Sequence, residues 1–134
     1  MDATQFRAAV TAEVVAWAAA NFPAVNVCYE NGPVPDQDKI SSPWVDMELR
    51  WFDSTQLTVS EGAGSRDHGV ISLAVYARTG TGTAQADAVM QSLRNTFKLR
   101  RIGSAVVRAP RQYTPTTVGG WYKVGLMFPF HLDQ

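Results

Sequence analysis

The chain contains one stretch, GVISLAVYAR at residues 69–78 followed by TGTGT at residues 79–83, in which a strand pattern runs directly into a helix pattern. Apolar side chains alternate over residues 69–78, which predicts a β-strand. Residues 83–98 then carry apolar side chains at helical spacing, namely Ala86, Val89, Met90, Leu93 and Phe97. This spacing predicts an amphipathic helix that packs one face against the sheet.

The glycine-rich turn between these two elements has a possible chemical meaning, because backbone N–H groups at such a turn can bind phosphate. Gly80 and Gly82 supply a G-x-G pattern, but Gln85 stands where a dinucleotide fingerprint has its third glycine. No Gly-Lys-Ser/Thr follows, so the turn is not a Walker loop. We therefore interpret it as a connection between strand and helix, and we expect no cofactor.

The N-terminal part of the chain predicts a first helix over residues 4–21. Four bulky residues recur on one face: Phe6, Val10, Val14 and Trp17. Asp2 or Thr4 can cap the start of the helix, and Pro23 stops it. Alternation over residues 25–30 then predicts a first strand, with Val25, Val27 and Tyr29 on one face and Cys28 on the other. A proline-rich loop follows over residues 31–43.

Alternation predicts a strand at 44–52, with Val45, Met47, Leu49 and Trp51 facing the core. A turn at residues 53–54, a further strand at 55–60 and a flexible loop at 61–68 are expected before the strand at 69–78. In the last third we expect a short strand at 105–109, an irregular tract at 110–117, a turn at 118–120 and a final strand at 121–132. Pro129 lacks an N–H, which predicts that this end of the final strand is an edge or a terminus.

The order of elements predicts the class α+β, with a mostly antiparallel sheet and two helices packed on one face. A chain of 134 residues is expected to form a single domain over residues 1–134. Twelve basic residues balance twelve acidic ones, which argues against a general nucleic-acid binder. Cys28 is the only cysteine, so no intrachain disulfide can form. We find no signal peptide and no apolar run of membrane-spanning length, so no membrane partner is expected.

The residues that could carry chemistry form no catalytic or metal-binding pattern. His68 and His131 have no second ligand at metal spacing, so we interpret them as solvated loop and terminal residues, and we expect no metal. Asp46 and Glu48 share a strand face with Arg50, which indicates a neutralised row rather than an acid–base pair. The sequence therefore does not predict an enzyme. Basic residues from 98 to 111 could face phosphate, but those after the helix also complement its dipole.

Some large side chains stand where water is expected. Trp44 and Phe52 lie on the polar face of their strand, and Tyr76 lies opposite the core face of its strand. Exposed aromatic and arginine residues commonly mark contact surfaces. Our candidate interface residues are Trp44, Phe52, Arg66, Tyr76 and Arg111. The alternative explanation is simple packing within the chain, with helices covering both faces of the sheet.

Residues 66–97 resemble the corresponding part of the tail terminator and tail-completion proteins of long-tailed bacteriophages. The likeness continues at Asn21-Phe22-Pro23, at Pro43-Trp44-Val45, at Gly120-Trp121-Tyr122 and at Phe128-Pro129-Phe130. The resemblance implies a virion protein that is made in the host cytoplasm and lies at the head-proximal end of the tail. It also implies a homo-oligomeric ring of six subunits and no catalytic residues.

The same resemblance implies the partners. The ring would contact other copies of the chain, the tail tube protein and the head–tail connector or head-closure protein, with transient contact to DNA in its channel. Candidate contact elements are the loops 31–43 and 61–68 and the tract 110–119. The sequence does not separate a terminator from a head-closure or joining protein. A monomeric ligand-binding or enzymatic α+β domain is the third hypothesis.

Overall fold

The structure is a computed structural model that describes residues 1–33, 36, 39–40, 42–56 and 64–133. Its elements follow in chain order as α1 (Ala3–Asn21), β1 (Asn26–Tyr29), β2 (Trp44–Gln56), β3 (Ser65–Arg78), α2 (Ala84–Phe97), β4 (Arg101–Ile102), β5 (Ala105–Val107), β6 (Arg111–Gln112), β7 (Thr116–Val118) and β8 (Trp121–Asp133). The two helices and the strand-rich sheet confirm the predicted α+β class.

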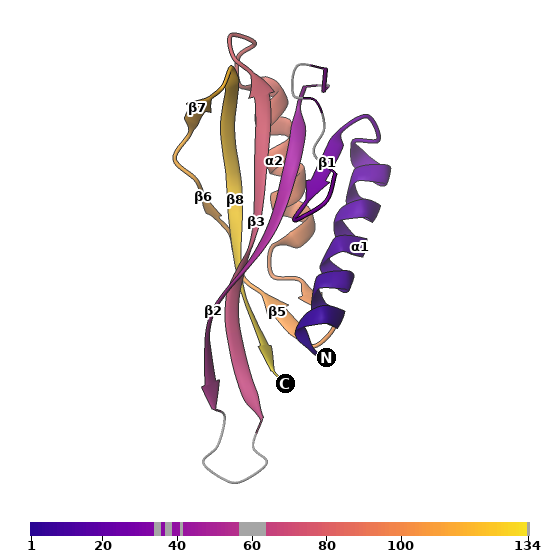
Figure 1. Ribbon diagram of the computed structural model, residues 1–134, viewed down its shortest axis with the longest axis vertical. Helices are drawn as coiled ribbons and strands as arrows, with labels where there is room; N and C mark the ends of the chain where they lie inside the picture. Colours follow the sequence, from indigo (N-terminus) through magenta and orange to yellow (C-terminus); the bar gives the residue numbers. More distant parts are fainter. Residues whose placement is uncertain (34–35, 37–38, 41, 57–63, 134) are drawn as a thin grey trace.

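One sheet contains all the strands of the described residues, in the order β1-β2-β3-β8-β5-β4 (Figure 1). The pair β1–β2 is parallel, and every other described pair is antiparallel. The short strands β5, β6 and β7 lie one after another along β8 and together form its second neighbour. The long strands β2, β3 and β8 therefore form the centre of the molecule.

Both helices pack on the same face of the sheet, which we call the core face (Figure 1). The helix α1 contributes the four residues that the sequence predicted, Phe6, Val10, Val14 and Trp17, and all are buried. Those predicted for α2 are buried as well. Asp2 begins α1 with a capping box, in which its side chain accepts from the backbone N–H of Gln5 at 2.8 Å. Helical periodicity thus placed both helices correctly.

The hairpin of β2 and β3 is longer than predicted. The expected turn at residues 53–54 and the separate strand from residue 55 are wrong, because β2 continues without a break of pairing direction to Gln56. The expected loop 61–68 is wrong from residue 65 onward, because β3 begins at Ser65. The residues from 57 to 63, including Leu57 and Val59, lie outside the described residues. In Figure 1 the paired end of β2 and start of β3 extend beyond the first turn of α1.

The polar composition of residues 53–56 and 65–68 misled the prediction, because turns are also polar. In the hairpin these residues pair across the strands, and the hydroxyl of Ser54 donates a hydrogen bond to the carboxylate of Asp67. The register shifts between Trp51 and Asp53, so Phe52 is the extra residue of a β-bulge. The bulge ends the clean alternation that predicted the first half of β2.

The tract at 110–117 is not irregular, because β6 and β7 pair with β8. Between them, the N–H of Tyr113 donates to the carbonyl of Gly125 at 2.9 Å. The predicted edge at Pro129 is also wrong, since β8 runs through this residue to Asp133 with β3 on one side. On the other side the carbonyl of Pro129 accepts from the N–H of Arg108 at 2.8 Å, in the gap between β5 and β6. The missing N–H of the proline therefore faces an interruption in the neighbouring strand.

Candidate interaction surface

The face of the sheet opposite the helices, which we call the outer face, is covered at one end by the chain itself. Trp44 is only 5% exposed, because Tyr76, Ile40 and Trp121 pack around it. The rings of Trp44 and Tyr76 are stacked, and Trp121 meets Trp44 edge-on with ring centroids 5.8 Å apart. The guanidinium of Arg78 lies 4.5 Å from the centre of the Trp121 ring. The expectation that Trp44 would be exposed is therefore wrong, and Tyr76 is partly buried against it.

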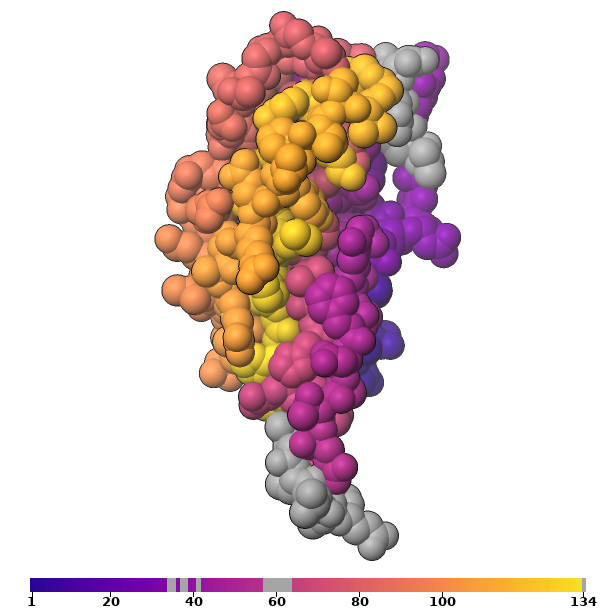
Figure 2. Space-filling view, turned by 90° about the vertical axis from the view of Figure 1, so that its left-hand side faces the viewer, coloured from indigo at the N-terminus to yellow at the C-terminus, as the bar shows by residue number. Residues whose placement is uncertain are grey.

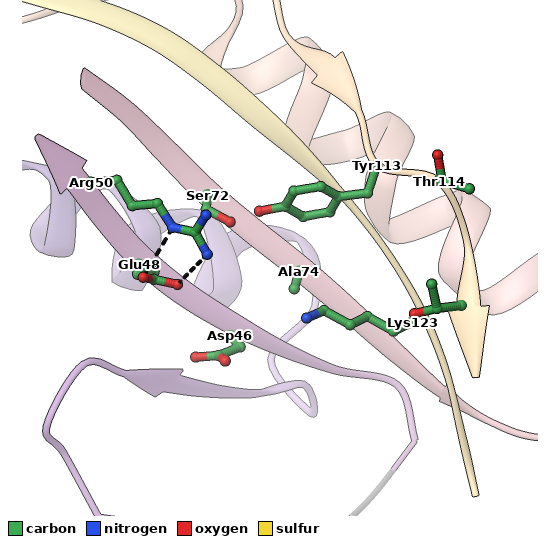
Figure 3. A pocket seen from close by; sticks show the side chains of 9 residues that line it. Asp46, Glu48, Arg50, Ser72, Ala74, Tyr113, Thr114 and Lys123 are labelled. Carbon is green, nitrogen blue, oxygen red and sulfur yellow. Dashed lines mark hydrogen bonds and ion pairs between the residues drawn. The ribbon is translucent and has the colours of Figure 1, made fainter. Parts of the chain in front are cut away.

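The middle of the outer face holds a polar pocket of about 220 Å³ (Figure 3). Glu48 and Arg50 form an ion pair at 3.1 Å, as the neutralised row predicted. Burial raises the pKa of Asp46, the nearby charge of Glu48 raises it further, and Lys123 opposes both effects. Tyr113 reaches over the sheet into this pocket from the segment between β6 and β7. Charges of both signs balance here, and nothing in the arrangement marks a nucleophile.

The other end of the outer face is open and contains a groove of about 600 Å³, which has an apolar floor and arginine side chains on one side. Figure 2 shows β8 and β3 uncovered between the segment that carries β6 and the lower half of β2. We call this the basic groove; it is lined by Phe52, His68, Gly69, Val70, Arg108, Ala109, Arg111, Met127, Pro129 and Phe130. Phe52 is 66% exposed. The structure thus brings together two of the candidate interface residues, Phe52 and Arg111, from distant parts of the chain.

His68 and His131 are not separate solvated residues, as the sequence suggested, but direct partners across β3 and β8. Their ring centroids are 6.4 Å apart. Burial lowers the pKa of His131, and the positive charges of Arg66, Arg108 and His68 lower it further against the opposing effect of Asp133. Among the described residues, no group of three His, Cys, Asp or Glu side chains could hold a metal ion.

Arg66 lies next to this pair on the outer face and is engaged within the chain. Its Nε and Nη2 donate to the two carboxylate oxygens of Asp133 at 2.7 and 3.1 Å. This two-point hydrogen bond lowers the pKa of Asp133. Arg66 therefore ties β3 to β8, which leaves less reason to expect it in a contact with another protein.

A second hollow, of about 370 Å³, lies on the other side of Phe52. We call it the acidic hollow; it is lined by Ala3, Trp51, Phe52, Asp53, Ser54 and Asp67. Trp51 is 36% exposed although its ring packs edge-on against Phe6 and Phe130 on the core face. This hollow was not predicted, because residues 53–54 have the composition of a turn. The bulge at Phe52 positions these side chains, and strand alternation does not reveal it.

The remaining predicted features have structural explanations. Gly80 and Gly82 have positive φ angles of 88° and 81°, and a Cβ atom at either would meet open space. They shape the turn before α2 and line no described pocket. In the basic segment after α2, Arg100 forms an ion pair with Glu13 of α1 at 2.8 Å. That arginine therefore links the start of the C-terminal segment to the first helix.

Comparison with known proteins identifies the family. A model of the phage tail terminator protein family matches residues 5–130, and the chain belongs to this family. It therefore has a structural role in the phage tail, and the family is not a class of enzymes. No curated protein matches the chain. A solved structure that shares 22% sequence identity with the chain has a TM-score of 0.73, with 100% of this chain and 96% of the other covered. That likeness supports the fold alone.

None of the described helices is long and apolar enough to cross a membrane.

Proposed function

We propose that six copies of the chain form a ring at the head-proximal end of the phage tail tube. The family match over residues 5–130 is the observation that carries this proposal. The open end of the outer face supports it, because exposed aromatic and arginine side chains around an apolar floor are typical of protein contacts. The ring docks on the last ring of tail tube protein, stops its polymerisation and offers its other face to the head connector.

Capping of the tail tube requires only binding between proteins and no catalysed reaction. A subunit that contacts its neighbour through two different surfaces forms a closed ring when the rotation between neighbours closes. The balanced charge of the chain weakens repulsion between copies. DNA would pass through the ring with transient contacts only. Assembly would take place in the host cytoplasm, and the finished ring would remain in the virion.

Electron microscopy of particles made without the protein tests the proposal. Tails much longer than normal would support a terminator, since polymerisation would continue past its usual end. Tails of normal length without heads would contradict the capping role and favour a head-closure or joining protein. Adding purified protein back during assembly should restore normal length, and this addition serves as the control for indirect effects of the deletion.

A further inference from the structure

We propose that the contact between neighbouring subunits places residues 51–53 of one copy in the basic groove of the next copy, with Asp53 facing Arg108 and Arg111. This inference rests on the proposed ring and names the two surfaces that would form it. The occupant is a second copy of the chain, and the segment that enters the groove is the bulged part of β2.

The two surfaces carry opposite charges. Among the described residues that line the basic groove, Arg108 and Arg111 are positive and none is acidic. Among those that line the acidic hollow, Asp53 and Asp67 are negative and none is basic. Both surfaces also contain apolar side chains, and they meet at Phe52. The same chain therefore carries one surface with positive charge and one with negative charge. A head-to-tail contact needs two complementary surfaces of this kind.

The bulged part of β2 is accessible to another molecule. The pairing of β1 with β2 ends at Met47, and the carboxylate of Glu30 accepts from the N–H of Leu49. Beyond Leu49, no strand of the described residues pairs with this side of β2. Residues 51–53 thus lie at an edge of the sheet, and Phe52 projects from it with two-thirds of its surface in water.

The chemistry of the groove suits these side chains. Val70, Met127 and Pro129 supply an apolar floor for an aromatic ring. Arg108 and Arg111 are exposed and stand on the opposite side of the groove from Phe52. An arginine can bind a carboxylate and stack on an aromatic face at the same contact. DNA could use both arginines, but its phosphates would leave the apolar floor and Asp53 without a role.

Charge reversal tests the pairing. In the first variant Asp53→Arg is made alone, in the second Arg108→Asp and Arg111→Asp are made together, and in the third all three changes are combined. Light scattering across concentration, with and without tail tubes, measures assembly. Each of the first two variants should raise the concentration for half-assembly at least about tenfold, and the combined variant should recover most of that loss. Circular dichroism should show all three variants folded, because the changed residues are exposed.

A disulfide test separates contacts between copies from contacts within one copy. In a Cys28→Ser background, Asp53→Cys with Arg111→Cys should give a ladder of linked subunits under oxidising conditions. The pair Asp53→Cys with Asp87→Cys is the matched control, because Asp87 lies on α2 and outside both surfaces. A ladder in the control, or only monomer in the test pair, would overturn the inference.

The outcomes also separate this inference from the proposed function. If the reversed variants assemble normally and cap tails at normal length, the pairing is wrong and the ring proposal stands. If tails do not lengthen without the protein, the capping role is wrong, whatever the crosslinks show. A short DNA duplex whose binding depends on Arg108 and Arg111, with assembly unaffected by any reversal, would assign the groove to nucleic acid and overturn the inference.

Discussion

The indole of Trp44 lies parallel to the phenol ring of Tyr76, with ring centroids 4.0 Å apart and an angle of 5° between the planes. These residues are cross-strand partners on β2 and β3, on the face that the sequence assigned to water. Trp121 from β8 and Ile40 complete the cluster. Two aromatic residues that look like contacts for a partner in the sequence therefore form a second small core.

Replacing Trp44 by Ala should destabilise the fold strongly. The buried indole loses its contacts with both Tyr76 and Trp121, and the hole left behind adds to the cost. We expect the free energy of unfolding to fall by about 3–5 kcal/mol in urea denaturation. A loss below about 1 kcal/mol, similar to that of a surface position, would mean that the cluster adds little to the fold.

Replacing Phe52 by Ala should leave the stability of the fold almost unchanged and weaken assembly. The side chain is mostly exposed, so the free energy of unfolding should change by no more than about 0.5 kcal/mol. If the proposed subunit contact is right, assembly measured by light scattering should still weaken, since Phe52 would be the aromatic anchor. Phe52→Leu is the matched control and should retain part of the assembly. Normal assembly by Phe52→Ala would argue against this anchor.

The sequence predicted best where one residue pattern settled the structure. Periodicity predicted α1 and α2 to within about a turn, and alternation predicted the strands that became β3 and β8. The outer part of the β2–β3 hairpin was missed because residues 53–56 and 65–68 are all polar, so no alternation of apolar and polar side chains marks it. The strands β6 and β7 were missed because they are defined by backbone hydrogen bonds to β8. Strands of two or three residues are too short to show an alternating pattern in the sequence.

The candidate site was predicted in part for a similar reason. Phe52 was selected as a large side chain where water is expected, Arg111 was selected as an arginine, and both line the basic groove. Their nearness could not be predicted, because it depends on Arg111 lying beside β8 and on the bulge in β2. Trp44 was misjudged because its cover comes from Trp121, far away in the sequence. Long-range contacts of this kind have no local signal.

A methyl group at Gly125 should disturb the outer face. A Cβ atom there would lie 2.4 Å from the carbonyl oxygen of Leu73 and 2.8 Å from the ring of Tyr113. Gly125→Ala should therefore lower the free energy of unfolding by about 1–3 kcal/mol, as overpacking does. Tyr113→Ala in the same background should recover only part of the loss, because the clash with the backbone remains. Full recovery would show that the ring alone limits the space.

The contribution of the capping box at the start of α1 to the free energy of unfolding should be measurable with variants of Asp2. Asp2→Ala removes the acceptor for the N–H of Gln5 while leaving the buried face of the helix unchanged. We expect a loss of about 1 kcal/mol in the free energy of unfolding. Asp2→Asn keeps an acceptor oxygen and should cost less. Equal losses for both variants would indicate that the negative charge near the helix N-terminus matters more than the hydrogen bond.

The stability of the protein should fall in acid partly because of His131. Its pKa is lower in the folded chain than the ordinary 6.5, because of burial and the neighbouring cations, so the unfolded chain binds a proton more readily. The stabilisation is complete above pH 6.5 and is lost as the pH falls from there through the folded pKa. His131→Gln should remove this part of the pH dependence. Urea unfolding at about pH 8 and about pH 5.5 should show the wild type losing more stability than the variant. Equal losses would mean that His131 titrates alike in the folded and unfolded chain, and that other groups cause the acid sensitivity.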